Sequence, residues 1–203
     1  MPGRETEEKR QHSTTLIPYS YYECWLPEYF ANVPMHWHSE FEINFLHHGK
    51  GEFICGNRKL KAAKGDILIL PPNMLHTAYP RKGHVLIYDA FVFSPVLLGA
   101  NSGDRCTAEC IRPIINGCVK SCVHIRPDSE GYAAIKAMTE RILSCVHANS
   151  PRSDLLLKSE LMRLVWTLEC GGHIIFQQDS GSGHDEIIRP VLEYMAGNYQ
   201  NDI

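Results

Sequence analysis

The chain has 203 residues, with 20 lysines and arginines, 23 aspartates and glutamates, and a formal net charge of -3 at pH 7. This length suffices for one sizeable core, or for one core with an added helical layer, and excludes two unrelated large domains. The slightly acidic balance lacks the clustered basic residues that grip a phosphate backbone. We therefore do not expect this segment to hold DNA itself.

The N-terminal stretch, residues 1–13, is charged and has no apolar periodicity, which predicts a disordered tail. It lacks the apolar central run of a signal peptide, and no stretch of the sequence is apolar for long enough to span a bilayer. We therefore expect a cytoplasmic protein with no membrane partner. In that compartment the 8 cysteines are expected as reduced thiols, and no pair of them has the C-x-x-C spacing of a zinc or redox site.

Residues 14–98 alternate short apolar runs with turn-forming segments, and we interpret them as a β-barrel domain. The segments HHGKG, GNRK, AAKG, PPN and PRKG separate the runs. Many short strands at close spacing are typical of a β-sandwich or barrel. The runs expected as strands are Tyr19–Leu26, Phe41–Leu46, Gly51–Cys55, Asp66–Leu70 and Val85–Phe93.

Residues 99–176 are predicted to be a helical segment. Apolar side chains recur every three or four positions from Ser129 to His147, which predicts an amphipathic helix. A second helix is expected after Pro151, with Ser153 or Asp154 as its N-cap. The apolar stripe of that second helix contains Leu157, Leu161, Leu164, Val165 and Leu168. The stripe either packs against the barrel or supplies a dimer seam.

The polar, Gly- and Ser-rich stretch QQDSGSGHDE, residues 177–186, has the composition of a flexible linker. In residues 187–203 the apolar side chains Ile188, Val191, Leu192 and Met195 again fall on one helical face. One helix after a linker cannot bury its own apolar face. We therefore expect residues 187–203 to begin a further domain.

The most informative residues are His36, His38 and Glu42, followed by His76 after a later strand. Side chains two apart on a strand project to the same face, so the first three can converge and Asn44 continues their face. Three imidazoles and one carboxylate suit a transition metal such as Zn, Ni, Fe or Mn, with one or two coordination positions left for water or a ligand. The alternative is that the same side chains hydrogen-bond an effector directly.

Large aromatic side chains are further candidates for the wall of a pocket. Trp25, Trp37 and Phe53 could each stack on an effector, although aromatics in a small barrel are more often core residues. Tyr88 is the preferred ligand-binding candidate, because a late barrel strand often faces the pocket and the tyrosine hydroxyl both donates and accepts hydrogen bonds.

These residues resemble the two motifs of the cupin superfamily. The first motif, H-x-H, three residues, E, six residues, G, is matched by His36, His38, Glu42 and Gly49. The second, G, five residues, P-x-G, two residues, H, three residues, N, is matched by Gly65, Pro71 and His76. It departs at Asn73, where the family has Gly, and at Pro80, where it has Asn; Asn tolerates left-handed turn geometry. The resemblance covers residues 15–95 and implies a double-stranded β-helix, or jelly roll.

A second resemblance covers nearly the whole chain from Thr15. The HWHSEFEI segment, two helices after the barrel and the closing IIRPVLEYMAGNYQNDI together look like AraC/XylS-type transcription regulators. The likeness implies a non-enzymatic domain that binds a small metabolite, with a sugar as one candidate, and a homodimer formed through the C-terminal helices. DNA would then be contacted only through a helix-turn-helix domain that continues beyond Ile203. A metal-dependent cupin enzyme, such as a dioxygenase or isomerase, is the rival hypothesis.

Overall fold

The computed structural model describes residues 6–7, 10–116 and 122–174. The strands are β1 (Thr6–Glu7), β2 (Tyr19–Leu26), β3 (Val33–Trp37), β4 (Phe41–Cys55), β5 (Arg58–Ala63), β6 (Ile67–Leu70), β7 (His76–Pro80), β8 (Leu86–Phe93) and β9 (Val123–Ile125). The helices are α1 (Arg112–Ile115), α2 (Tyr132–Ala148) and α3 (Pro151–Cys170), with a 3-10 turn at Pro95–Leu98 and a π-helical turn at Thr107–Ile111. The predicted linker and the predicted helix after it lie outside the described residues.

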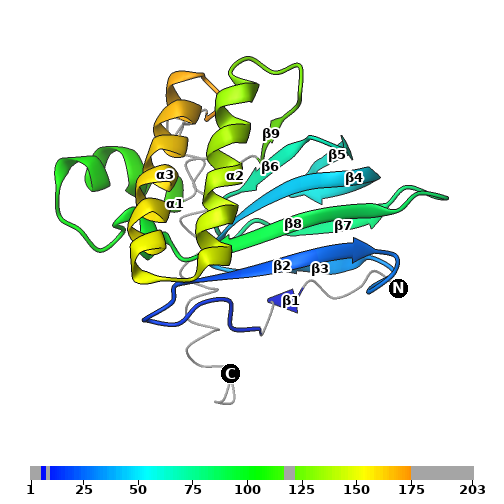
Figure 1. Cartoon of the computed structure of the whole chain (residues 1–203), viewed down its shortest axis with the longest axis horizontal. Helices are drawn as coiled ribbons and strands as arrows, with labels where there is room; N and C mark the ends of the chain where they lie inside the picture. Colours follow the sequence, from blue (N-terminus) through cyan, green and yellow to red (C-terminus); the bar gives the residue numbers. More distant parts are fainter. Residues whose placement is uncertain (1–5, 8–9, 117–121, 175–203) are drawn as a thin grey trace, which may run out of the picture.

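The long strand β4 organises the sheet, because its two halves pair with different neighbours. Residues 41–49 pair antiparallel with β8 and, in part, with β6, whereas residues 50–55 pair with β5 and β7. The register shifts between Leu46 and His48, where β4 passes from one group of strands to the other. Strands β2 and β9 extend the first group, and β3 and β1 extend the second. This arrangement confirms the predicted mainly β fold of the jelly-roll type with appended helices (Figure 1).

Alternation along β4 separates two hydrophobic cores. Ile43 and Phe45 point away from the barrel and pack in one cluster with the side chains of α2 and α3. Leu46 and Phe53 belong to a second cluster, which fills the barrel interior. Because successive side chains of a strand face opposite sides, Glu42 and Asn44 share the face that does not carry Ile43 and Phe45. One strand therefore borders both the candidate site and the helical layer.

Helices α2 and α3 pack side by side across the outer face of the sheet (Figure 1). Ser150 caps α3: its side chain accepts a hydrogen bond from the Ser153 amide, while the Ser153 hydroxyl accepts one from the Ser150 amide. The prediction of Ser153 or Asp154 as N-cap is therefore wrong, because Pro151 already occupies the first helical position. Among the described residues, every helix is too short or too polar to span a lipid bilayer.

The leucine stripe of α3 packs inside the chain. Leu157, Leu161, Leu164 and Leu168 are each 0 to 2% exposed and lie in the cluster shared with α2 and the outer face of the sheet. Side chains this deeply buried cannot also face a second copy of the chain. Of the two interpretations of the stripe, internal packing is the one that the structure supports, and the dimer seam through these leucines is wrong.

The structure departs from the expected boundaries at both ends of the barrel. In the segment expected to be a disordered tail, Thr6–Glu7 pairs in parallel with β3 and His12 is 4% exposed. In the segment expected to be helical, β9 pairs with β6 and adds a strand to the sheet. Both differences arise from pairing with strands that are distant in sequence, which local composition does not report.

Candidate metal and effector site

Four side chains from three strands and one turn converge at one end of the barrel. His36 lies on β3 and His76 on β7, and these two residues are direct partners in the antiparallel pairing of the two strands. His38 lies in the short turn after β3, and Glu42 returns on β4. The prediction that His36, His38 and Glu42 share one strand face is wrong, because β3 ends at Trp37 and β4 begins at Phe41. The pairing of β7 with β3 adds His76, the residue expected from a later strand.

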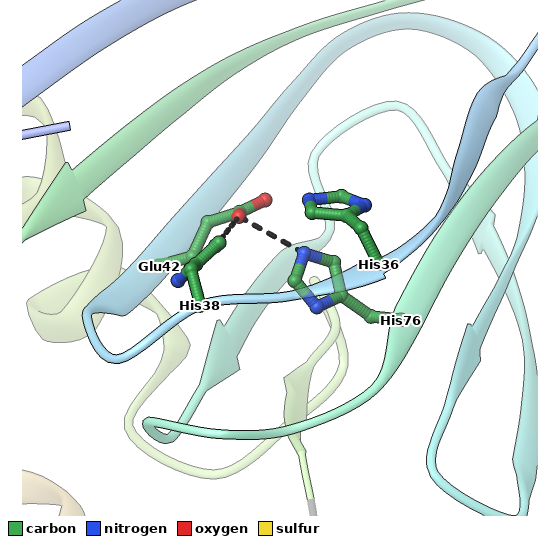
Figure 2. A group of neighbouring side chains, drawn as sticks. All are labelled: His36, His38, Glu42 and His76. Atoms are coloured by element: carbon green, nitrogen blue, oxygen red, sulfur yellow. Dashed lines mark hydrogen bonds and ion pairs between the residues drawn. The ribbon is translucent and has the colours of Figure 1, made fainter. Parts of the chain in front are cut away.

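The candidate ligand atoms of His36, His38, Glu42 and His76 all lie within 4.8 Å of one another. Glu42 is at the centre: its Oε2 atom is 3.1 Å from His38 Nε2 and 3.2 Å from His76 Nε2 (Figure 2). His38, Glu42 and His76 are 5, 7 and 4% exposed, whereas His36 is half-buried. The cluster is thus enclosed on the barrel side and reachable at His36.

Backbone carbonyl groups fix the orientation of the three imidazoles. A carbonyl oxygen only accepts hydrogen bonds, so an Nδ1 atom in contact with one carries a proton. The Nδ1 atoms of His36, His76 and His38 donate to the carbonyl oxygens of Pro34 at 2.8 Å, Met74 at 2.7 Å and Glu40 at 3.2 Å. This leaves Nε2 as the nitrogen that can bind a metal, which is the arrangement that outer hydrogen bonds impose on metal-binding histidines.

The loop before β7 supports the cluster directly. The backbone amide of Asn73 donates to the carbonyl oxygen of His38 at 2.8 Å, so the two segments that carry imidazoles are tied together. Asn73 has a φ of 61°, the left-handed conformation in which the cupin motif has glycine. The substitution of Asn for Gly therefore keeps the turn that places His76.

Opposite charges in the cluster stabilise each other. Burial alone raises the pKa of Glu42, but the charge of His76 and the contacts with His38 and His76 outweigh it and hold the pKa well below its ordinary value. Burial alone lowers the pKa of His76, and the neighbouring Glu42 carboxylate outweighs it and raises the pKa. The carboxylate is therefore ionised at neutral pH, as a metal ligand must be.

The residues present fit a transition metal. His76 Nε2 is buried and, within the described part of the chain, has only the ion-pair contact with Glu42 and no hydrogen-bond partner of good geometry. A buried polar atom without a partner is costly, and a metal bound at this nitrogen would remove the cost. Three imidazoles and a carboxylate are the donors that Zn, Ni, Fe and Mn accept.

The other two predicted ligand-binding residues, Asn44 and Tyr88, lie on the paired strands β4 and β8. Asn44 is fully buried, and its Nδ2 atom donates to Glu42 Oε1 at 2.7 Å. Its Oδ1 atom has no hydrogen-bond partner among the described residues and is available to a donor on a ligand. Tyr88 is 2% exposed and its ring meets that of Phe53 edge-on at 5.4 Å, so it lies within the barrel core and outside the cluster.

His12 is a residue of this region that the sequence analysis missed. Its ring centroid lies 5.0 Å from that of His38, and its Nδ1 atom is 3.0 Å from the Tyr22 hydroxyl. Its backbone carbonyl accepts a hydrogen bond of 2.6 Å from Ser20. No motif spacing includes His12, because the N-terminal segment reaches the cluster through the parallel pairing of β1 with β3.

The fold and the cluster together define a cupin-type barrel. The AraC-like ligand binding domain family matches residues 29–165 of the chain, and the chain belongs to that family. The match includes the four residues of the cluster, the other two predicted site residues and most of α3. No curated protein matches the chain.

Several solved structures are similar to part of the chain. A cupin 2 conserved barrel domain protein from Rhodopseudomonas palustris is 18% identical, with a TM-score of 0.35, over 39% of this chain and 55% of that protein. A cupin protein from Bacteroides fragilis is 23% identical, with a TM-score of 0.37, over 47% of this chain and 79% of that one. A predicted oxalate decarboxylase from Thermotoga maritima is 21% identical, with a TM-score of 0.35, over 38% and 68% of the two chains. The chain thus spans little more than half of the first of these proteins.

Proposed function

We propose that this chain is the effector-sensing and dimerising region of a DNA-binding transcription regulator. A small metabolite, with a sugar as one candidate, binds in the barrel beside His36, His38, Glu42 and His76. The observation that carries the proposal is the convergence of these four side chains within 4.8 Å in a member of the AraC-like ligand-binding family. DNA is contacted by a helix-turn-helix domain of the same protein, beyond the described residues.

The same four residues hold a transition metal in this proposal. When bound, the metal supplies a fixed positive charge that attracts and polarises an oxygen atom of the effector. The protein supplies the rest: the backbone carbonyl contacts orient the imidazoles, and Asn44 offers a buried acceptor, Oδ1, to a hydroxyl or amine of the effector. Direct hydrogen bonding of the effector by an unmetallated cluster is the alternative.

Elemental analysis of the protein purified without chelators tests the metal. We expect about one equivalent of a transition metal in the wild type and a loss of at least about tenfold in a His36→Ala, His76→Ala double variant. The His84→Ala variant is the control, because His84 is an exposed histidine in the turn before β8. Equal metal content in the double variant and the control would exclude a metal at the cluster.

A thermal-shift screen of small metabolites tests the effector site. A ligand that binds the folded state at 100 times its Kd stabilises the protein by about 2.7 kcal/mol, which for this length raises Tm by roughly 5–10 °C. The Asn44→Ala variant should lose most of that shift if the effector uses the buried amide. A screen in which no metabolite raises Tm in the presence of metal would favour a purely structural barrel.

For the homodimer we propose the exposed face of α3 in place of the buried leucine stripe. Leu155 and Trp166 are 75 and 66% exposed, and the half-buried Met162 lies between them on the same face. Large apolar side chains at helical spacing, exposed on a helix whose other face is buried, are suited to pairing with a second copy of the helix. Sedimentation should report a folded monomer for Leu155→Glu with Trp166→Glu, whereas Lys82→Glu, in the exposed turn before β8, should leave the dimer intact.

A metal-dependent enzyme is the second candidate, because the complete set of three histidines and one glutamate can leave coordination positions open for a substrate. The two functions differ in the fate of the bound molecule. A sensor releases its effector unchanged, so a metabolite found in the thermal-shift screen should be recovered intact after prolonged incubation with the metal-loaded protein. Its consumption in proportion to time and protein concentration would establish the enzyme instead.

A further inference from the structure

A second cavity lies outside the barrel, on the outer face of β2. Tyr21, Glu23 and Trp25 alternate along this strand and share its outer face. The C-terminal end of α2 and the neighbouring strand β8 border the same surface (Figure 1). The cavity has a volume of about 400 Å³, and its lining consists of Tyr21, Glu23, Cys24, Trp25, Tyr29, His47, Ile87, Asp89 and His147. It shares none of the residues of the histidine cluster.

Aromatic rings form much of the cavity wall. The Trp25 and Tyr29 rings meet edge-on with their centroids 5.8 Å apart, and both side chains remain substantially exposed, at 41 and 56%. The Tyr21 ring lies at the other side of the cavity, in edge-on contact with His147 at 4.5 Å. Trp25 and Tyr29 thus hold a defined mutual geometry without being buried in a core, which leaves their faces available to a ligand.

The charged side chains of this lining are acidic. Asp89 is 9% exposed; it accepts hydrogen bonds from the Tyr21 hydroxyl at 2.7 Å and from His47 Nε2 at 2.6 Å. Glu23 is exposed at the rim, and the lining contains no lysine or arginine. His147 belongs to the last turn of α2, where the helix dipole adds partial negative charge. Aromatic faces, carboxylates and a helix C-terminus all favour a cation.

We propose that this cavity binds a small organic cation, of the class of quaternary or alkylated ammonium ions, outside the barrel site. The ring faces of Trp25 and Tyr29 attract the diffuse positive charge, and Glu23 compensates it from the rim. Such cations are weakly hydrated and carry no donor that needs a precise acceptor, so an aromatic wall with a nearby carboxylate is sufficient to hold them.

The charged residues of an adjoining cavity favour binding of the cation beside Trp25. A neighbouring cavity of about 550 Å³ shares His47, Asp89 and His147 with the cavity beside Trp25. The lining of this neighbouring cavity also contains Lys64 and Lys136. Lys136 is paired with Glu140 at 2.6 Å, whereas Lys64 has no ion-pair partner among the described residues. Because these lysines border only that cavity, a cation is favoured at the aromatic end beside Trp25.

Choline is the probe for the test, with 3,3-dimethylbutan-1-ol as its neutral isostere of nearly the same shape. The chain has 3 tryptophans, and in a Trp37→Phe, Trp166→Phe double variant only Trp25 remains. The tryptophan fluorescence of that variant therefore reports binding in the cavity beside Trp25. We expect choline to change this fluorescence saturably below about 50 mM and the isostere to bind at least about fivefold more weakly.

Two variants localise the binding. The Trp25→Leu and Glu23→Gln variants should each weaken choline binding by about two- to fivefold or more. Because Trp25→Leu removes the fluorescent reporter, its binding is followed by NMR of the choline methyl groups. Glu169→Gln, which removes an exposed carboxylate from α3, should leave it unchanged. Equal binding of choline and the neutral isostere, unaltered binding in both cavity variants, or no binding by about 50 mM would each overturn the proposal. None of these outcomes depends on the metal or the effector of the barrel site.

Discussion

The variant Leu161→Ala tests whether the leucine stripe of α3 is internal core. Leu161 is 1% exposed and belongs to the cluster that joins α3 to α2 and the sheet. Truncation of a buried leucine to alanine costs about 2–5 kcal/mol, which for a chain of this length lowers Tm by roughly 5–15 °C. The matched control is Leu156→Ala on the same helix, which is 48% exposed, lies off the proposed dimer face and should cost about 1 kcal/mol or less.

Circular dichroism melts at two protein concentrations about a hundredfold apart distinguish the two roles of the stripe. If Leu161 is internal core, its Tm deficit relative to Leu156→Ala is the same at both concentrations. A dimer seam would give a deficit that grows on dilution, together with a folded monomer in sedimentation. Equal effects of the two substitutions, or a stable monomer of Leu161→Ala, would refute the packing described for α3.

Three further predictions concern single contacts. Hydrogen bonds from Arg141 hold the pKa of Glu160 below its ordinary value of 4.5, so Glu160→Gln should cost about 1 kcal/mol at pH 7 in urea unfolding, a difference lost as the pH falls below 4.5. Burial and a hydrogen bond to a carboxylate raise the pKa of Tyr19 to about 12, so stability should fall between about pH 10 and 12, and Tyr19→Phe should lose less stability over that range than the wild type. Gly49→Ala should lower the free energy of unfolding by about 3 kcal/mol or more, because φ is +82° and a Cβ would lie 1.6 Å from a backbone oxygen. Its control is Gly83→Ala, where φ is +77° but no atom lies within 4 Å of the added Cβ; thermal melts should show a loss of about 1–2 kcal/mol.

The strands that the sequence predicted are those whose own side chains alternate or are continuously apolar. Tyr19–Leu26 and Leu86–Phe93 fall within one residue of their expected bounds. Arg58–Ala63 and His76–Pro80 were missed, because RKLKAA and HTAYP carry little apolar signal and become strands by pairing with β4. The HHGKG segment was expected as a turn, yet it continues β4 through a register shift, since neighbouring strands on both sides supply hydrogen bonds.

The histidine cluster was predictable because motif spacing encodes a fold in which distant strands meet. The spacing of His36, His38 and Glu42 was interpreted as one strand face, whereas a turn after Trp37 separates His36 from Glu42. His12 was missed because its contact with the cluster depends on long-range pairing of the N-terminal segment. For Trp25, composition gave no way to choose between core, pocket wall and surface.

The packing of β4 shows why the barrel and the helices form one folding unit. The expected boundary at residue 98 separates strands from helices, but a single hydrophobic cluster crosses it and includes Ile43, Phe45, Ile135 and Leu161. Removal of α2 and α3 would expose the outer face of the sheet, so the barrel alone is not expected to stay folded and soluble. Because Glu42 and Asn44 alternate with Ile43 and Phe45, any shift of β4 on ligand binding also moves the sheet surface on which α2 and α3 pack. An effector that binds one position of β4 more tightly than another therefore changes the packing of α2 and α3 with no separate connecting element.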